Sequence, residues 1–508
     1  MIPRWLITLT VMLPTLIEIV DISIVNVSLD HIRGSLSAGI DESTWAITSY
    51  LVSNAIVIPL SGWMARLVGR KRYLIGSITL FTVSSLLCGM AWSLQSLIFF
   101  RVLQGIGGGG LQPLSQSILL ETYPPKQHGM AMGIFGIGAM FGPILGPILG
   151  GTISDNLSWR WIFYINVPIG IIAVLLTAYA IVDPPYMKRK AGMTIDYIGI
   201  LLLAVGIGAL QILLDKGERA DWFAADYITV LALVSAACLS VFVVYELYYT
   251  DHPVLDLRVM KNVSFTTGNL VMFFAFMCFF SSIVLLPIYL QTLMGYTSTL
   301  AGYVLGPGGI ATLFTMPIVG KMVSKGHQKK LITIGICLNA YALFMLSGID
   351  LYTDFHTVSF YRIVLGVGIG MIFVPLTTLT LSTVPKEGMG NASAIYNFLR
   401  NLGGGFGVAL VTTIVSQRAQ FHQARLVEHL TVFDKPYRFA LDRANGRMIG
   451  AGAGFSGDSA IFRELQRQAS MLSFNDAFYV SAVMMVLVLP MMLLIKKGKA
   501  PSGPAAVH

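Results

Sequence analysis

Two acidic side chains lie inside the first apolar segment of the chain, at Glu18 and Asp21. Because they are three residues apart, they share one face of a helix. Two neighbouring carboxyl groups in a low-dielectric environment retain a proton more readily than in water, as a proton carrier requires. The alternative is a structural role, in which one carboxylate is locked in an ion pair with Arg101. We favour proton binding by one or both acids, because ionisable groups within membrane segments mark function by default.

Further polar side chains accompany these acids. Arg101 is followed one turn later by Gln104, and Asn26 lies about one turn beyond Asp21. A nearby cation favours the ionised carboxylate, so we expect Arg101 to set the protonation state of the acids. We assign Asn26 and Gln104 to the same polar network or to a substrate cavity. Arg362 lies near the end of a later apolar segment, and we expect its guanidinium to snorkel to the membrane interface.

A second polar cluster, formed by Asn397, Arg400 and Asn401, lies within the thirteenth apolar segment. It faces either a substrate cavity or a neighbouring helix, and the sequence leaves both interpretations open. We include Asn397 and Arg400 among the predicted cavity or network residues.

Motifs for catalysis or nucleotide binding are missing. The chain contains no P-loop, H-E-x-x-H or G-x-S-x-G motif, which argues against ATP-driven transport and hydrolase chemistry. The stretch 105–110 formally matches G-x-G-x-x-G, but it lies within an apolar segment, so close helix packing explains it better. The four cysteines have no C-x-x-C spacing and are predicted to be buried, inert thiols. We therefore predict no enzyme activity, no catalytic residue, no metal and no cofactor, with an ion gradient as the energy source.

Composition indicates a membrane protein. Hydrophobic residues make up 55% of the 508 residues and charged residues only 12%, and the mean hydropathy is +0.73. Soluble domains carry about 25% charged residues, so a soluble enzyme is excluded. The net charge of +9 comes from short basic tracts between apolar runs, so we read it as a topology signal and expect lipid, not nucleic acid, as the partner.

Apolar windows of about twenty residues predict fourteen transmembrane helices. Basic residues are concentrated in the two termini and in alternate loops, so both termini are predicted to be cytoplasmic. The strongest basic tracts are Arg66 with Arg70, Lys71 and Arg72, then Lys188, Arg189 and Lys190, then Lys321, Lys325, Lys329 and Lys330, and finally Lys496, Lys497 and Lys499. The windows begin near Ile7, Thr44, Tyr73, Ser96, Met130, Trp161, Tyr197, Tyr227, Phe265, Thr299, Leu331, Thr357, Gly390 and Asp476.

One long segment, 417–474, connects the last two predicted spans on the outer side. It contains two stretches with helical spacing of apolar residues, one following Phe421 and one around Leu465. We favour a helical pair lying on the membrane surface over an element dedicated to docking a partner.

An internal repeat divides the predicted spans into halves. Pro59-Leu-Ser-Gly62 recurs as Pro317-Ile-Val-Gly320, and Phe99-Phe-Arg101 recurs as Phe360-Tyr-Arg362, each in the same order. Parallel repeats of six helices are the arrangement of major-facilitator transporters, which hold the substrate between the halves. We predict an all-α integral membrane protein with this fold, arranged as six, two and six helices. Its parts are an N-terminal half (1–183), a linker with an inserted helix pair (184–262), a C-terminal half (263–499) and a cytoplasmic tail (500–508).

The fifth predicted span has prolines and small residues at helical spacing, which is typical of a kinked and tightly packed helix. Such a helix suits a moving bundle interface. The residues are Gly138, Gly142, Pro143, Gly146, Pro147, Gly150 and Gly151.

Taken together, the motifs resemble those of the fourteen-helix drug:proton antiporters of the major facilitator superfamily, and among them the EmrB-type pump subunits. The resemblance runs over almost the whole chain. It is carried by Asp21 to Val27 in the first span, Arg101 to Gly105 in the fourth, Gly138 to Gly151 in the fifth, Trp159 to Gly170 in the sixth, and the basic loop with Gly62, Gly69, Arg70 and Lys71.

The resemblance implies export of amphipathic drugs across an inner membrane in exchange for protons, with Asp21 and Arg101 in the coupling network. In cells with two membranes it also implies a periplasmic adaptor and an outer-membrane channel, with segment 417–474 as the contact. The chain departs from the family at two positions. Arg66 stands where the wider superfamily has an aspartate, and Glu18 is an acid where a neutral polar residue is usual.

Three functions are compatible with these features. We favour a proton-driven exporter of hydrophobic or amphipathic compounds, with aromatic and Met side chains such as those of 273–280 in its cavity. The alternative within the same fold is an exporter dedicated to one metabolite, fatty acid or siderophore. A membrane receptor without transport is disfavoured by the presence of Asp21, Arg101 and the proline-rich fifth span.

Overall fold

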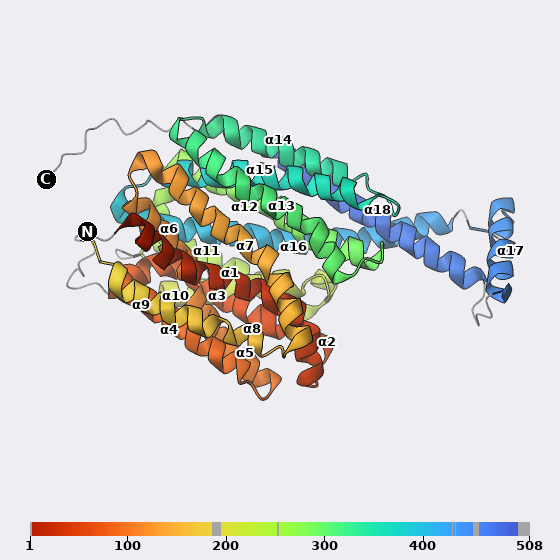
Figure 1. Cartoon of the computed structure of the whole chain (residues 1–508), viewed down its shortest axis with the longest axis horizontal. Coiled ribbons are helices and arrows are strands. Elements are labelled where there is room, and N and C mark those ends of the chain that lie inside the picture. The colour runs from red at the N-terminus through yellow and green to blue at the C-terminus, as the bar shows by residue number, and fades with distance from the viewer. Residues whose placement is uncertain are drawn as a thin grey trace.

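The computed structural model describes residues 3–184, 195–250, 253–428, 430–431, 433–450 and 457–495. In these ranges the chain forms helices and turns and contains no strand (Figure 1). The basic tract at 188–190, the lysines of 496–499 and the predicted tail lie outside the described residues. The helices are α1 (Arg4–Ser35), α2 (Ile40–Ser43), α3 (Trp45–Val68), α4 (Arg70–Gly89), α5 (Leu94–Gly108), α6 (Leu111–Thr122), α7 (His128–Asn156), α8 (Trp161–Tyr164), α9 (Asn166–Ala180), α10 (Tyr197–Lys216), α11 (Asp226–Tyr248), α12 (Val263–Thr292), α13 (Ser298–Ser324), α14 (Gln328–Leu346), α15 (Phe355–Leu381), α16 (Met389–Val427), α17 (Lys435–Gly450), α18 (Gly457–Leu487) and α19 (Met491–Leu494).

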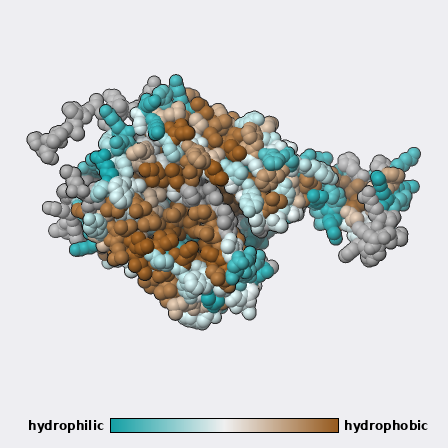
Figure 2. Space-filling model, viewed as in Figure 1, coloured by the Kyte–Doolittle hydropathy of each residue, from teal (hydrophilic) through white to brown (hydrophobic). Residues whose placement is uncertain are grey.

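The described part of the chain contains 12 helical segments that are long and apolar enough to cross a membrane. The other two of the fourteen predicted spans correspond to the broken pair α5–α6 and to α7. These helices are not among the 12, so the count of fourteen stays a prediction. Figure 2 shows a broad hydrophobic surface over the middle of the bundle, with hydrophilic residues gathered toward its two ends. Such an apolar belt fits the hydrocarbon core of a bilayer.

The helices before and after the α10–α11 pair pack in one common pattern. In the first group α1 packs on α7 and α9, α3 on α5, and α4 on α5 and α9. In the second group α12 packs on α16 and α18, α13 on α15, and α14 on α15 and α18. The pairings correspond one to one in chain order, as two copies of a six-helix unit would. We call these groups the N-terminal half and the C-terminal half.

The two halves contact each other through glycines near the end of the bundle at which α1 begins. A Cβ atom at Gly62, near the end of α3, would lie 2.8 Å from the backbone of Gly390, at the start of α16. A Cβ atom at Gly129, at the start of α7, would lie 2.6 Å from the carbonyl oxygen of Gly320 in α13. The rings of Phe135 and Phe373 also stack between the halves, 6.3 Å apart. At this end, therefore, the halves meet at backbone contact distance.

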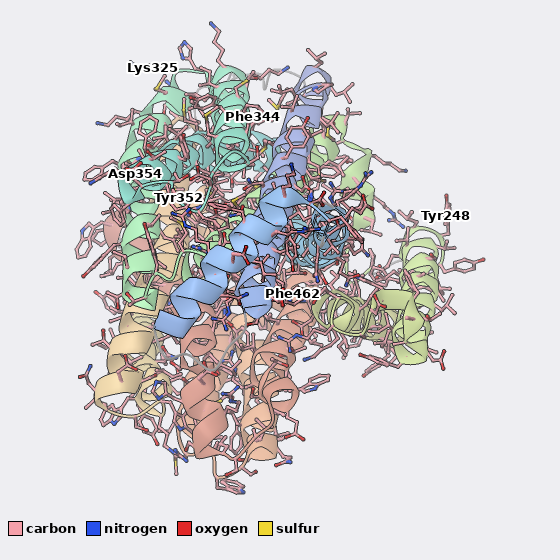
Figure 3. The ribbon with its side chains drawn as sticks, turned by 90° about the vertical axis from the view of Figure 1, so that its right-hand side faces the viewer. Tyr248, Lys325, Phe344, Tyr352, Asp354 and Phe462 are labelled. Atoms are coloured by element: carbon pink, nitrogen blue, oxygen red, sulfur yellow. The ribbon has the colours of Figure 1, made fainter. Side chains whose placement is uncertain are left out.

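The α10–α11 helices form a pair of their own. They pack against each other, and α10 touches α3 of one half and α16 of the other. Figure 3 shows the pair at the edge of the bundle, with Tyr248 pointing away from the other helices. The exposed face of α11 is apolar and includes Val230, Leu233 and Val241, as expected for a helix that faces lipid.

Segment 417–474 does not form a separate helical pair on the membrane surface, so that prediction is wrong. Residues up to Val427 continue α16, and residues from Gly457 continue into α18, while α17 joins them at the far tip (Figure 1). Asp476 of α18 accepts hydrogen bonds from Arg418, at 2.5 Å, and from His422, at 2.8 Å, both in α16. The apolar periodicity of this segment is real, but Leu465 and Ala469 are buried against protein. The two helices and α17 therefore form an arm that projects from the bundle, which we call the α17 arm.

Candidate functional site

Asp21 forms a buried ion pair with Arg101 in the N-terminal half. One Nη atom of Arg101, in α5, lies 2.6 Å from a carboxylate oxygen of Asp21, in α1. Each residue is 1% exposed. Arg101 also donates to the backbone oxygen of Ala46 at 2.9 Å and stacks on the ring of Tyr50, 4.2 Å from its centre, both in α3. This arrangement links α1, α3 and α5, and losing one partner would leave the other charge buried alone.

Amide groups complete the coordination of Asp21. Gln104 donates to its second carboxylate oxygen at 2.9 Å, and Asn166 of α9 donates to the same oxygen at 2.8 Å. Helix α5 begins with a reciprocal cap between Ser93 and Ser96, and the three-residue spacing of Arg101 and Gln104 places both on one face of it. Both oxygens of Asp21 therefore have donors, and the carboxylate is fully satisfied.

Glu18 has a different environment from Asp21, although both are buried in α1. It accepts a hydrogen bond from Asn54 at 3.3 Å and one from Gln112 of α6 at 2.7 Å. Both donors are neutral amides, and among the residues that the structure describes no cation forms an ion pair with Glu18. Gly108 makes room for this cluster, because a Cβ atom there would lie 2.6 Å from the hydroxyl of Tyr50 and 3.4 Å from Glu18.

The hydrogen bonds of Glu18 continue into the other half of the protein. The side-chain oxygen of Gln112 accepts from Arg400, which lies in α16. One turn further along α6, the side-chain oxygen of Gln116 accepts from Asn397 at 2.6 Å. An amide that donates to a carboxylate and accepts from a guanidinium couples the two charges. We call this chain, Glu18 to Gln112 to Arg400, the cross-half relay.

The structure therefore brings together most of the predicted site residues. Asp21, Arg101 and Gln104 form one buried cluster, and Glu18, Asn397 and Arg400 belong to the contacts between the halves. The open question about Asn397 and Arg400 is thereby answered, because they reach across to α6. Asn26 is exposed and lies outside both clusters, so it does not belong to the polar network, and its alternative assignment to a substrate cavity stays a prediction.

Sequence reasoning missed four polar partners in the spans. Their signal was available, because an amide in an apolar helix needs a hydrogen-bond partner as much as a charge does. Gln112 and Gln116 are also four residues apart, which places them on one face of a helix. The missed residues are Asn54, Gln112, Gln116 and Asn166.

Arg362 does not snorkel, so that prediction is wrong. The residue is only 6% exposed, and its guanidinium points inward to the hydroxyl of Ser282 in α12, at 3.2 Å. Its Nε atom has no hydrogen-bond partner. The position of a residue near the end of a span indicates its depth in the membrane but not the face of the helix on which it lies. Arg362 lies on the face that packs against α12, so its side chain is buried.

Helix α7 packs closely on α1, as its glycine pattern predicts. The positions Gly138, Gly142, Gly146 and Gly150 all face α1, where a Cβ atom would collide with α1 atoms. Gly151 faces open space instead. The structure describes the backbone of Pro143 and Pro147 but not their side chains. The glycine stripe thus seats the helix that carries Glu18 and Asp21.

The basic loop motif serves to anchor helix ends. Gly69 ends α3 with a φ of 96°, a conformation that glycine adopts without strain. Arg70 forms an ion pair with Glu121 at 2.6 Å, and Asp183 accepts from the backbone nitrogen of Lys71 at 2.8 Å. Arg66 interacts electrostatically with Asp256, so an opposite charge does face this position.

Two minor predictions have mixed outcomes. The glycines of 105–110 lie against neighbouring backbone, since a Cβ atom at Gly107 would lie 2.5 Å from the nitrogen of Phe81, which fits close packing. The cysteines are free thiols, but only Cys88 and Cys278 are buried, and Cys337 is exposed, so the prediction that all four are buried is wrong.

Comparison with known proteins identifies relatives over nearly the full length. Residues 11–408 match the family described as Major Facilitator Superfamily. The chain is 37% identical over 497 residues to the multidrug export protein EmrB of Escherichia coli (strain K12), covering 96% of this chain and 94% of that protein. It is 36% identical to the fatty acid resistance protein FarB of Neisseria gonorrhoeae, covering 96% of each chain.

Solved structures show the same fold at low sequence identity. The human organic anion transporter MFSD10 superimposes with a TM-score of 0.64 at 11% identity, covering 97% of this chain and 100% of that chain. A double Trp mutant of XylE superimposes with a TM-score of 0.64 at 16% identity, covering 98% and 97%. At these identities the likeness concerns the fold alone.

Proposed function

Because the chain belongs to the Major Facilitator Superfamily and is an EmrB-type transporter, we propose that it exports amphipathic compounds across the inner membrane in exchange for protons. Relatives similar over almost the whole chain carry names that refer to multidrug export. The same relatives are transporters and not enzymes, in agreement with the missing catalytic motifs.

The observation that carries the proposal is the cross-half relay. Glu18 in the N-terminal half is connected through Gln112 to Arg400 in the C-terminal half. Protonation of Glu18 would remove the negative charge that is coupled to Arg400 through Gln112. The hydrogen bond from Arg400 to Gln112, which joins the two halves, would then be weaker. A transporter that rocks one half against the other needs such a proton-dependent contact.

Asp21 and Arg101 have a supporting role in this proposal. Their ion pair lies within one half and joins α1 to α5, so it moves with that half as a unit. Asp21 pairs with Arg101, while Glu18, whose direct partners are neutral amides, exchanges the proton. This division of roles accounts for two acids on one face of α1.

Aromatic side chains beside the relay provide the surface for an amphipathic substrate. Arg400 lies over the ring of Phe276, 5.6 Å from its centre. Phe276 in turn contacts the rings of Phe279, Phe280 and Phe373 at centroid distances of about 6 Å. A substrate bound against these rings would be next to the group that responds to the proton.

The α17 arm is the part of the molecule best placed to meet a partner outside the membrane. It projects beyond the bundle at the end opposite the start of α1 (Figure 1). With both termini in the cytoplasm, the arm would extend outward, where a periplasmic adaptor and an outer-membrane channel could receive the exported compound. Co-purification of an adaptor with the full chain, and its loss on shortening the arm, would test this part.

The proposal as a whole is tested with purified protein in liposomes. An imposed pH gradient should drive accumulation of ethidium, an amphipathic cation, and Glu18→Gln should reduce it by tenfold or more. Competition by chemically unrelated compounds distinguishes a multidrug exporter from a dedicated one. Ligand binding without any proton-driven movement would indicate a receptor and contradict the proposal.

A second candidate function is export of fatty acids, which the FarB relative favours. It uses the same fold and the same proton pathway, and it differs only in the charge of the substrate. Competition between a fatty acid and ethidium for transport would separate the two candidates.

A further inference from the structure

The two halves place an arginine at equivalent positions, but within the described part of the chain only one of these arginines has a counter-ion. The same spacing of 261 residues separates Arg101 from Arg362 and Asp21 from Ser282. The contact between the first two residues is an ion pair of 2.6 Å, and the contact between their equivalents is a hydrogen bond of 3.2 Å to a neutral hydroxyl. The C-terminal half therefore has the cation of this pair and a serine in place of the acid.

The other partners of Arg101 are missing at Arg362 as well. Between α3 and α13 the spacing is 258 residues, as between Pro59 and Pro317, so the position equivalent to Tyr50, which stacks on Arg101, is Gly308 and has no ring. The position equivalent to Gln104 is Leu365. Among the described residues no acidic side chain forms an ion pair or an electrostatic interaction with Arg362. A cation in this environment lacks the compensation that buried charges normally require.

The polar atoms around Arg362 are suited to a carboxylate or sulfonate. Its Nη1 atom donates a hydrogen bond to Ser282, whereas its Nε atom has no hydrogen-bond partner among the described residues, which leaves a donor edge for a planar anion. Ser359 lies three residues earlier on the same face of α15, and its buried hydroxyl also has no partner. The free edge of the guanidinium and the Ser359 hydroxyl suit a group with a single negative charge, whereas Ser282 already donates its hydroxyl proton to a backbone oxygen and serves to hold the arginine.

Apolar side chains adjoin this cluster along α12. Phe279 precedes Ser282 by three residues, and its backbone oxygen accepts the hydrogen bond of the Ser282 hydroxyl at 2.8 Å. Its ring contacts Phe276 and Phe280, at 6.0 Å each. A cation at the edge of an aromatic cluster fits a molecule with an anionic head and an apolar body.

From these observations we propose that Arg362, positioned by Ser282 and assisted by Ser359, binds the anionic head of an exported amphiphile. The inference rests on the proposed export function and specifies one class of its substrates. An anionic phospholipid of the membrane carries a similar head, so the experiment must distinguish a transported compound from a resident lipid.

The test compares two dyes in liposomes, anilinonaphthalene sulfonate as the anion and ethidium as the cation. Arg362→Gln should lower pH-driven transport of the sulfonate tenfold or more and leave that of ethidium within about twofold. Truncating one member of a buried charge pair commonly costs more than about 1.4 kcal/mol, which corresponds to a tenfold change. Equal loss of both dyes, or no loss of the sulfonate, would overturn the inference.

A second variant tests the same site in case Arg362→Gln does not fold. Ser282→Asp supplies the missing internal counter-ion and reproduces the Asp21–Arg101 pair, so it should fold at least as well as the wild type. It should nevertheless lose transport of the sulfonate to the same degree, because Arg362 is then occupied. Unchanged sulfonate transport by Ser282→Asp would contradict the inference.

Two further measurements separate the remaining outcomes. Equilibrium dialysis of the sulfonate against detergent-solubilised protein tests the site even if no pH-driven transport occurs, so failure of the export proposal does not decide this one. Melting temperatures in nanodiscs with and without phosphatidylglycerol test the lipid. A lipid-dependent shift that requires Arg362, together with sulfonate binding that does not, would assign the site to lipid and refute the substrate role.

Discussion

The arginine of the N-terminal half is surrounded by partners, and the arginine of the C-terminal half has almost none. Arg101 contacts a carboxylate, a side-chain amide, a backbone oxygen and an aromatic ring. Arg362 contacts one hydroxyl. The same helix pair, α1 with α5 or α12 with α15, therefore builds a rigid internal anchor in one half and an unsatisfied polar site in the other. A repeated scaffold can thus keep a side chain while changing its role.

The largest effect that this comparison predicts is on stability at Asp21. Asp21→Ala leaves Arg101 buried without a counter-ion and should lower the free energy of unfolding by about 3–5 kcal/mol. Ser282→Ala is the matched control in the C-terminal half, and it should cost only about 1 kcal/mol because it removes one hydrogen bond to an arginine that already lacks a counter-ion. Thermal unfolding of both variants in the same detergent measures the difference. Similar melting temperatures would show that the two arginines are equivalent after all.

An intermediate effect is expected at Gly308, the position that corresponds to Tyr50. A Cβ atom there would lie 2.6 Å from the backbone oxygen of Arg362, so Gly308→Ala should destabilise by about 1–3 kcal/mol through overpacking of α13 against α15. Gly302 in the same helix has no atom within 4 Å of a Cβ atom, and Gly302→Ala is the control. The control should be neutral or slightly stabilising, because alanine is the better helix former. Loss of stability in both variants would point to helix flexibility and not to close packing.

The smallest expected effect is at Arg362 itself. Arg362→Met removes an unpaired buried cation and should change the free energy of unfolding by no more than about 1 kcal/mol, in the stabilising direction. Arg101→Met should be strongly destabilising, since it leaves Asp21 without its cation. Chemical or thermal unfolding of the two variants side by side checks the sign. A strongly destabilised Arg362→Met would mean that the arginine has a structural partner in the native protein.

The sequence was sufficient to predict the fold class and the main polar residues. Glu18, Asp21 and Arg101 stand out because charges in apolar segments are rare, and the repeat shows which segments correspond. The connection from Gln112 to Arg400 could not be predicted, because it depends on how the two halves are docked and not on the spacing within one helix. The inward orientation of Arg362 was missed. The spacing from Asp21 to Ser282 equals the spacing from Arg101 to Arg362, and this equality would have indicated Ser282 as the partner of Arg362.

The α17 arm illustrates a different limit. Its apolar periodicity correctly predicts helices, but periodicity does not specify whether the apolar face meets lipid or protein. The contacts of Asp476 with Arg418 and His422 link α16 and α18 to each other. Such contacts between distant segments determine the course of the arm and are visible only in the structure.

The central claim is that Glu18 exchanges the proton and communicates with the C-terminal half through Gln112 and Arg400. The most direct test measures proton release from detergent-solubilised protein with a pH indicator when ethidium is added. The wild type should release protons on binding, and Glu18→Gln, which keeps a hydrogen-bonding amide of the same size, should bind ethidium without releasing them. Unchanged proton release from Glu18→Gln would contradict the claim.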